Sequence, residues 1–329
     1  MANSLLMHAS EVLFQGTHQP VAIPVCDHYA GSEKLMRKSL ALQAALGPVF
    51  DITLDCEDGA AAGNEIAHSK LVGDLLSSSE NRYNSIGTRV HEASSPYFEE
   101  DVATICALAA DKLAYIVITK VETLHQLQSA VQTIHHHAAA AGRPALPIHV
   151  LIETHHAMRH VWDIASMESI ECFSFGIMDF VSSHYGAVPG DAMRSPGQFS
   201  HPLITRAKVE MSAASHAHGK VASHNVCAEI KDLSVVANDA SLASRQFGYQ
   251  RMWSLHPDQI KPILEAFAPA AHEVDDAVSI LHAALASDWG PIQHQGKLHD
   301  RASYRYYWTV LQRAKQTGQA LLAKAHDLL

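Results

Sequence analysis

The sequence of 329 residues has few cysteines and no Cys-x-x-Cys pair. Its five cysteines are an odd number, which argues against a disulfide framework, and their spacing does not fit a zinc ribbon. No run of 18 consecutive apolar residues occurs, so no segment is predicted to span a membrane. The N-terminus lacks a basic stretch followed by an apolar run and does not resemble a secretory signal. These absences predict a cytoplasmic protein with reduced, buried cysteines.

Positive charge is also scarce. The chain has 24 lysines and arginines against 34 aspartates and glutamates, for a net charge of −10. Nucleic acids and anionic membrane surfaces repel such a chain, so we expect neither as a partner. Hydrophobic residues make up 47% and charged residues 18%, which is typical of a chain with a full core and excludes a disordered one.

Eight short β-rich apolar runs are present, and amphipathic helical stretches separate them. Most of the intervals are close to thirty residues, the length of one βα unit. Eight such units predict a TIM (β/α)8 barrel. A doubly wound open sheet is the alternative, but no GxGxxG follows the first run. The predicted strands are 21–26, 49–56, 85–90, 114–121, 147–154, 170–177, 220–226 and 249–256.

The repeat pattern divides the chain into three parts. Residues 1–17 are an N-terminal segment that we expect to be flexible and leave outside the fold, and residues 18–268 are the barrel. Residues 269–329 lie outside the eightfold repeat and are predicted to form a helical extension, with a loop over 288–300 and one last helix from 301. The interval after the sixth strand carries a Gly- and Pro-rich insert, HYGAVPGDAMRSPGQFSHP (184–202).

Polar residues stand at the C-terminal end of seven of the eight predicted strands. In a TIM barrel the active site is built at these ends, so we expect a site there. The residues are Asp55, Glu57 and Asp58; Arg89 and His91; Lys120 and Glu122; Glu153; Asp179; His224 and Asn225; and His256.

Histidines are frequent around the fifth strand, in HVLIETHHAMRHVWD (149–163). His156 and His160 stand at i and i+4, which puts both on one face of a helix and allows a two-ligand zinc site. The text does not match the HExxH of zinc proteases, and spacing indicates no third ligand. Solvated histidines at the rim are therefore favoured over a zinc site.

Glu153 and Asp179 end adjacent strands, so their carboxylates are expected to converge at the barrel mouth. Two carboxylates with waters and an anionic substrate make a site for Mg²⁺, which prefers oxygen ligands. The alternative is that each carboxylate caps the helix that follows it. Arg89 would supply a fixed positive charge and a fork of donors to a carboxylate or enolate oxygen.

At these residues the sequence resembles the citrate lyase beta-subunit and malyl-CoA lyase group of the HpcH/HpaI aldolase superfamily. The resemblance covers most of the chain and includes a motif in the tail. The matching stretches are LDCEDGA (54–60), TRVHEASSPYFEED (88–101), ITKVET (118–123), LIET (151–154), FGIMDF (175–180), WSLHPDQI (253–260) and QGKLHD (295–300).

The resemblance implies a TIM barrel with a C-terminal helical extension, assembled as a homotrimer or homohexamer. It implies a carbon–carbon lyase that cleaves or condenses a 3-hydroxyacyl-CoA thioester with Mg²⁺, or with Mn²⁺ in its place. Glu153 and Asp179 would be the metal ligands, and Arg89 would bind substrate oxyanions. Glu57 and Asp58 would lie behind them, and Lys120 and His256 are candidates for the CoA side of the substrate. Asp300 would reach the site of a neighbouring subunit as the proton-transfer group.

Some positions depart from the family pattern, and they keep two other functions open. The stretch after the first strand reads IPVCDHYAGSEK (23–34) in place of a Pro-Gly turn with an arginine, and the family's RVN is RVH at 89–91. One alternative is a class II aldolase for free 2-oxo or hydroxy acids, without CoA. The other is a non-catalytic accessory or binding subunit. Asp300 also has an ordinary alternative, as the N-cap of the helix that follows it.

Overall fold

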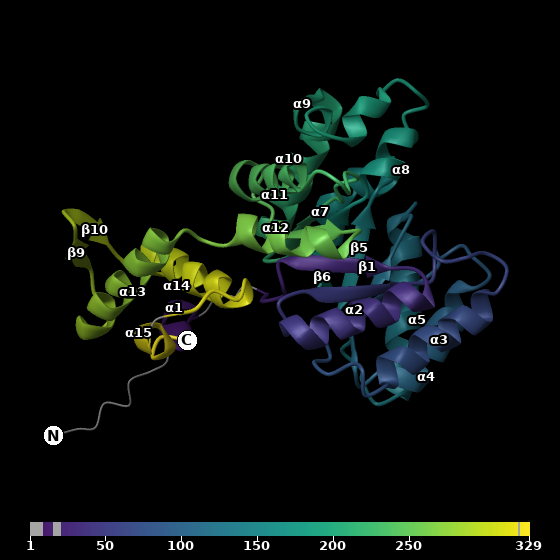
Figure 1. The fold of residues 1–329 in the computed structure, drawn as a ribbon, viewed down its shortest axis with the longest axis horizontal. Helices are drawn as coiled ribbons and strands as arrows, with labels where there is room; N and C mark the ends of the chain where they lie inside the picture. Colours follow the sequence, from purple (N-terminus) through teal and green to yellow (C-terminus); the bar gives the residue numbers. More distant parts are fainter. Residues whose placement is uncertain (1–8, 16–20, 322) are drawn as a thin grey trace. The chain divides into compact units, whose positions relative to one another are not determined.

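A closed barrel of eight parallel strands forms the larger part of the structure, a computed structural model that describes residues 9–15, 21–321 and 323–329 (Figure 1). The strands follow chain order, and β8 pairs with β1 to close the barrel. The predicted TIM barrel is confirmed. The strands are β1 Cys26–Ala30, β2 Asp51–Asp55, β3 Ile86–Arg89, β4 Leu113–Ile118, β5 Ile148–Ile152, β6 Ile170–Phe175, β7 Val221–His224 and β8 Arg251–Ser254.

Helices follow the strands and cover the outside of the barrel (Figure 1). The insert after β6 contains short helical pieces rather than a loop alone. The helices of this part are α2 Glu33–Leu46, α3 Glu65–Ser77, α4 Phe98–Ala109, α5 Leu124–Ala140, α6 His155–Arg159, α7 Val161–Ala165, α8 Ile177–Ser182, η1 Gly190–Met193, α9 Gly197–Ser200, α10 Pro202–Ala217, α11 Leu233–Gln246 and α12 Pro257–Phe267.

The first strand is not where the sequence pattern placed it. The prediction of 21–26 was wrong, since β1 runs from Cys26 to Ala30. Pro24 has no N–H, and a strand bonded on both sides needs one. The observed strand was hidden because Asp27 and His28 are polar, yet both are buried in the barrel. The other seven strands lie within three residues of their predicted bounds.

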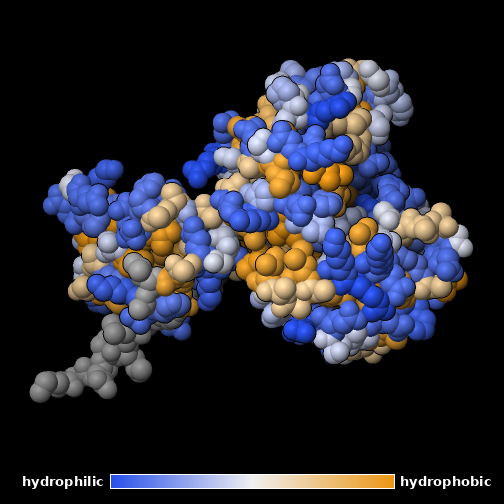
Figure 2. All heavy atoms as spheres, viewed as in Figure 1, coloured by the Kyte–Doolittle hydropathy of each residue, from blue (hydrophilic) through white to orange (hydrophobic). Residues whose placement is uncertain are grey.

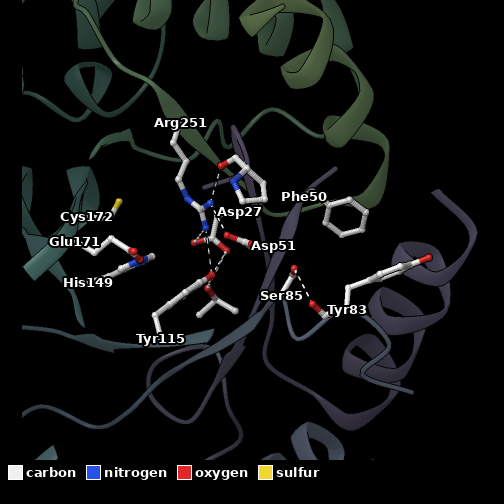
Figure 3. Close-up of polar contacts among 12 residues, drawn as sticks. Asp27, Phe50, Asp51, Tyr83, Ser85, Tyr115, His149, Glu171, Cys172 and Arg251 are labelled. Carbon is white, nitrogen blue, oxygen red and sulfur yellow. Dashed lines mark hydrogen bonds and ion pairs between the residues drawn. The ribbon is translucent and has the colours of Figure 1, made fainter. Parts of the chain in front are cut away.

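Near the N-terminal ends of the strands, the barrel interior holds a charged network rather than an apolar layer (Figure 3). The fully buried Arg251 donates from Nη1 to Asp51 Oδ2 and to the carbonyl of Pro24, both at 2.6 Å. Its Nη2 lies 3.3 Å from Asp27 Oδ2. Tyr115 donates to Asp27 at 3.2 Å. One guanidinium therefore faces two buried carboxyl groups, so the layer would carry excess negative charge if both were ionised.

Because of this charged network, we expect the free energy of unfolding to depend on pH. Burial raises the pKa of Asp51 from its usual acidic range to about 7, with Asp27 adding to the rise and Arg251 opposing it. Between about pH 4 and 7 the folded chain holds a proton that the unfolded chain has lost, so the free energy of unfolding falls as pH rises through this window. Asp51→Asn should flatten that fall by up to about 1.4 kcal/mol per pH unit.

Urea unfolding at a series of pH values measures this slope. Asp74→Asn is the matched control, because Asp74 is an exposed carboxylate that pairs with Lys70 at 2.6 Å on the surface. If Asp51→Asn and wild type lose stability equally between pH 4 and 7, Asp51 is ionised throughout and this account of the layer is wrong.

A second compact unit joins residues up to 23 with residues 267–329, and the barrel unit spans 24–266. Within the second unit α13 and α14 lie side by side (Figure 1). Residues 1–8 and 16–17 of the expected flexible segment lie outside the described residues, but residues 9–13 form α1, whose Ala9 and Leu13 are buried in this unit's core. Its elements are α1 Ala9–Leu13, α13 Ala271–Ala286, β9 Ile292–His294, β10 Lys297–His299, α14 Arg301–Gln316 and α15 Ala323–His326.

Two predictions for the tail need correction. The stretch 288–300, predicted as a loop, contains the antiparallel hairpin β9–β10. Its turn residues Gln295 and Gly296 both have positive φ, at 46° and 76°, which suits a tight two-residue hairpin turn. The helix predicted from residue 301 to the end of the chain is α14, which is shorter than predicted. It ends at Gln316 because Gly318, with φ at 73°, turns the backbone out of the helix.

The visible surface is mostly hydrophilic, with separate hydrophobic patches (Figure 2). Exposed large hydrophobic residues include Leu35 and Leu46, both on α2. Among the described residues, no helix is both long and apolar enough to cross a membrane. All five cysteines are free and buried.

Candidate active site

Arg89 is the centre of an ion-pair cluster at the C-terminal ends of β2 and β3. Its guanidinium binds Asp55 through two parallel bonds of 2.7 Å, Nε to Oδ1 and Nη2 to Oδ2. Its Nη1 lies 2.9 Å from Glu57 Oε2. The guanidinium carbon also lies 4.8 Å from the centre of the Tyr29 ring. Two of its five N–H groups donate to Asp55, and the ion pair with Glu57 adds a third contact, so the arginine is held in one orientation.

The loop after β2 is shaped around Asp55. The backbone N–H of Glu57 donates to Oδ1 at 3.0 Å, and that of Gly59 donates to Oδ2 at 2.6 Å. A Cβ at Gly59 would lie 2.2 Å from Oδ2, so only glycine fits there. Burial would raise the pKa of Asp55, but its hydrogen bonds with Arg89 hold that pKa below the usual value. The carboxylate is therefore a permanent negative partner for Arg89.

Lys120 lies after β4 and connects this cluster to the next strand end. Its Nζ forms ion pairs with Glu57 Oε1 and, at 3.0 Å, with Asp58 Oδ2. Burial alone would lower the pKa of Lys120, but these two partners raise it above the usual value. The backbone N–H of the same residue donates to Glu153 Oε1 at 2.8 Å.

Glu153 directly follows β5, and Asp179 lies in α8, the helix that follows β6. Glu153 is 2% exposed, whereas Asp179 is partly exposed in the first turn of α8. Burial raises the pKa of Glu153 to about 8, against the bond from Lys120, and the negative charge of Asp179 raises it further. Gly176 packs against Glu153, since a Cβ there would lie 2.5 Å from Oε2. The two carboxylates are electrostatically coupled, and a cation between them would relieve that repulsion.

The donor chemistry favours a hard cation. Within the ranges 9–15, 21–321 and 323–329, no group of three or more His, Cys, Asp or Glu side chains is placed to hold a metal. Two carboxylates with water and substrate oxygens can complete a Mg²⁺ shell, whereas a structural zinc site needs four protein ligands. His156 and His160 face acidic neighbours instead, Glu122 at 2.9 Å and Asp163 at 3.1 Å.

Most of the barrel also matches a known protein family. Residues 35–257 match the model of the HpcH/HpaI aldolase/citrate lyase family.

The chain belongs to this family.

The predicted resemblance and the prediction of a carbon–carbon lyase are confirmed. A crystal structure of a citrate lyase from Burkholderia xenovorans is 51% identical, with a TM-score of 0.84 over 98% of this chain and 100% of that one. The L-malyl-CoA/beta-methylmalyl-CoA lyase of Cereibacter sphaeroides is 25% identical over 87% of this chain and 92% of its own length. The protein CitE of Mycobacterium tuberculosis, solved with magnesium, acetoacetate and coenzyme A, has a TM-score of 0.66 at 19% identity, over 89% of this chain and 99% of its own.

A cavity of about 370 Å³ adjoins the ion-pair cluster of this family member. His91 lines it, and its Nδ1 lies 2.6 Å from the buried carboxylate of Asp101, which also accepts the His91 backbone N–H. The size suits a small acid or part of a larger ligand. The lining residues are Cys56, Glu57, Asp58, Ala60, Ala61, Ala62, Glu65, His68, His91, Glu92, Ser95 and Lys120.

Two predicted site residues, His256 and Asp300, have contacts within their own turns. His256 begins the turn before α12, where its Nδ1 accepts from the Asp258 backbone N–H at 3.3 Å. Asp300 belongs to the second unit and is the N-cap of α14, accepting from the N–H groups of Ala302 and Ser303 at 3.0 and 3.4 Å. Within its own chain Asp300 therefore has the ordinary capping role that the sequence allowed.

Asp55, Tyr29 and Gly176 had no role predicted from the sequence. Asp55 was placed at a strand end, but only the register shows that it pairs directly with Arg89 across β2 and β3. Tyr29 lies in β1, beyond the end of the first strand predicted from the sequence. Gly176 could have been noticed as a glycine inside the predicted sixth strand, 170–177, three residues before Asp179.

Proposed function

We propose that the protein is a Mg²⁺-dependent lyase that cleaves a 3-hydroxyacyl-CoA thioester such as malyl-CoA, citramalyl-CoA or citryl-CoA. The observation that carries this proposal is the coupled pair Glu153 and Asp179 beside the clamped Arg89 at the barrel mouth. The named lyase relatives support the thioester, and the magnesium-bound neighbour supports the metal.

Glu153 and Asp179 would hold the cation, with Mn²⁺ as a possible substitute. When bound, it would lower the pKa of the substrate hydroxyl and bind the oxygens of the keto acid product. Cleavage moves the electrons of the broken bond onto the thioester as an enolate. Arg89 has N–H groups beyond the two that donate to Asp55, and we assign them to the enolate oxygen, because a fixed donor needs no reorganisation when charge develops.

His256 remains our candidate for the CoA side of the substrate. The ammonium group of Lys120 is already engaged by Glu57 and Asp58, so a second role for it in binding CoA would need one of these ion pairs to open.

The five free, buried cysteines agree with a reducing cytoplasmic location.

A trimer or hexamer would give Asp300 a second role. We propose that it moves the proton at the enolate carbon in the site of a neighbouring subunit. Loss of an N-cap alone costs about 1 kcal/mol of stability and leaves the rate unchanged, whereas loss of a proton-transfer group costs about 10²–10⁴ in rate.

Subunit mixing separates these roles of Asp300. Asp300→Ala and Glu153→Gln proteins should each be inactive, and mixed oligomers should regain part of the activity, because some sites pair an intact metal centre with an intact Asp300. Subunit exchange is confirmed by native mass spectrometry with one protein isotope-labelled. Exchange without recovered activity would show that the site is not shared between chains.

The substrate class decides between the proposal and its main alternative, a class II aldolase for free acids. Malyl-, citramalyl-, β-methylmalyl- and citryl-CoA are compared with their free acids, each with and without Mg²⁺, and the keto acid formed is measured. We expect cleavage of at least one thioester and of no free acid. Cleavage of the free acids alone would favour the aldolase, and no cleavage of any compound would favour an accessory subunit.

A further inference from the structure

Lys120 has a backbone conformation that lysine rarely adopts. Its φ is +49°, in the left-handed region that favours glycine and asparagine. Five other described non-glycine residues share a positive φ: Asn84, Tyr185, Asp288, Trp289 and Gln295. None of these five follows a barrel strand at its C-terminal end, whereas Lys120 lies two residues after β4. Strain of this kind persists only where the surroundings enforce it.

The strained turn brings the backbone of β4 onto the carboxylate that ends β5. The N–H of Lys120 donates to Glu153 Oε1 at 2.8 Å. One residue further, the carbonyl of Val121 accepts from Thr154 Oγ1 at 2.6 Å. Gly176 leaves room beside Glu153 Oε2. One oxygen of the carboxylate is thus tied to the backbone, and the space beside the other is kept clear by a glycine.

The lysine side chain extends to the other half of the site. Its Nζ contacts Glu57 and Asp58 in the loop after β2, and Glu57 also pairs with Arg89. Lys120 therefore contacts both halves of the site, the carboxylate pair through its backbone and the arginine cluster through its side chain.

We propose that Lys120 is a positioning residue whose left-handed backbone, rather than its ammonium group, aims Glu153 at the cation. This rests on the proposed metal site. A glycine adopts the same backbone without strain, whereas the β-branched valine adopts it only at a large steric cost. Neither carries an ammonium group, so the difference between Lys120→Gly and Lys120→Val reports the backbone alone.

Isothermal titration of Mg²⁺ into the full-length protein tests the proposal without any need for a substrate. We expect Lys120→Gly to bind Mg²⁺ within about threefold of wild type, because the N–H donor keeps its place. We expect Lys120→Val to bind about tenfold more weakly or worse, since the donor leaves Glu153 Oε1. Thermal unfolding checks that each variant is folded. If the valine variant does not fold, Lys120→Ala and the left-handed-tolerant Lys120→Asn are the second pair, with the same expected order.

Equal losses of affinity in the glycine and valine variants would assign the effect to the ammonium group and overturn the proposal. Unchanged affinity in a folded valine variant would overturn it as well, because the surrounding fold would then set the turn. Wild type without measurable Mg²⁺ affinity would remove the metal site on which the proposal rests. Wild type that binds Mg²⁺ but cleaves no thioester contradicts the proposed function alone, and the glycine and valine affinities still decide the role of Lys120.

Discussion

Glu153→Gln is expected to abolish Mg²⁺-dependent turnover while the barrel stays folded. Glutamine keeps the size of the side chain and an oxygen that can accept the Lys120 N–H, but it loses the charge that compensates the cation. We expect about a 10³-fold loss in rate or more, and a clear loss of Mg²⁺ affinity. Because the buried carboxylate already has a raised pKa of about 8, removing its charge should not lower the melting temperature. Asp179→Asn should show the same losses in rate and affinity.

Steady-state kinetics and calorimetry with Mg²⁺ measure the two effects. Glu122→Gln is the matched control for Glu153→Gln, since Glu122 is an exposed glutamate that pairs with His156. Asp163→Asn, at an exposed aspartate paired with His160, serves the same purpose for Asp179→Asn. Both controls should keep wild-type kinetics. Mg²⁺ affinity equal to wild type in both Glu153→Gln and Asp179→Asn would remove these residues from the metal site.

Arg89→Lys is expected to lower kcat/KM by about 10²–10³-fold. Lysine keeps the positive charge but lacks the planar fork, so it cannot hold Asp55 with two parallel bonds and also present donors to an oxyanion. Asp55 is fully buried and would keep one weaker partner, so the melting temperature should fall too.

Arg37→Lys is the control for this substitution, because Arg37 is an exposed arginine that also contacts two carboxylates, Glu33 and Glu80. It should leave both activity and stability near wild type. A drop of less than tenfold in kcat/KM for Arg89→Lys, together with a lower melting temperature, would make Arg89 a structural ion-pair partner only.

The sequence sufficed for the barrel because seven of its strands are apolar runs with polar residues at their ends. The remaining strand, β1, was not predicted correctly, because it contains polar residues. Positions in the barrel interior such as Asp27 can be polar when a buried partner such as Arg251 comes from elsewhere in the chain. Apolar patterning does not report such pairs, which form only when the barrel closes.

For the candidate site, the sequence identified residues but not the contacts between them. Arg89, Glu57 and Glu153 could be named because strand ends meet at one face of a barrel. The pairing of Asp55 with Arg89 depends on the register of β2 against β3, which no local pattern specifies. The role of Lys120 depends on a backbone angle that its residue type disfavours. The proposed role of Asp300 depends on a second subunit, so one chain alone does not determine it.

The central claim is that this chain breaks a carbon–carbon bond of a CoA thioester only when Mg²⁺ is bound. The most direct measurement treats the protein with EDTA, removes the chelator, supplies malyl-CoA and follows acetyl-CoA and glyoxylate before and after Mg²⁺ is added, with the three related thioesters run in parallel. We predict no products before the addition and, for at least one thioester, equimolar acyl-CoA and keto acid after it. Cleavage at an unchanged rate without Mg²⁺, or no cleavage of any thioester with it, would contradict the account.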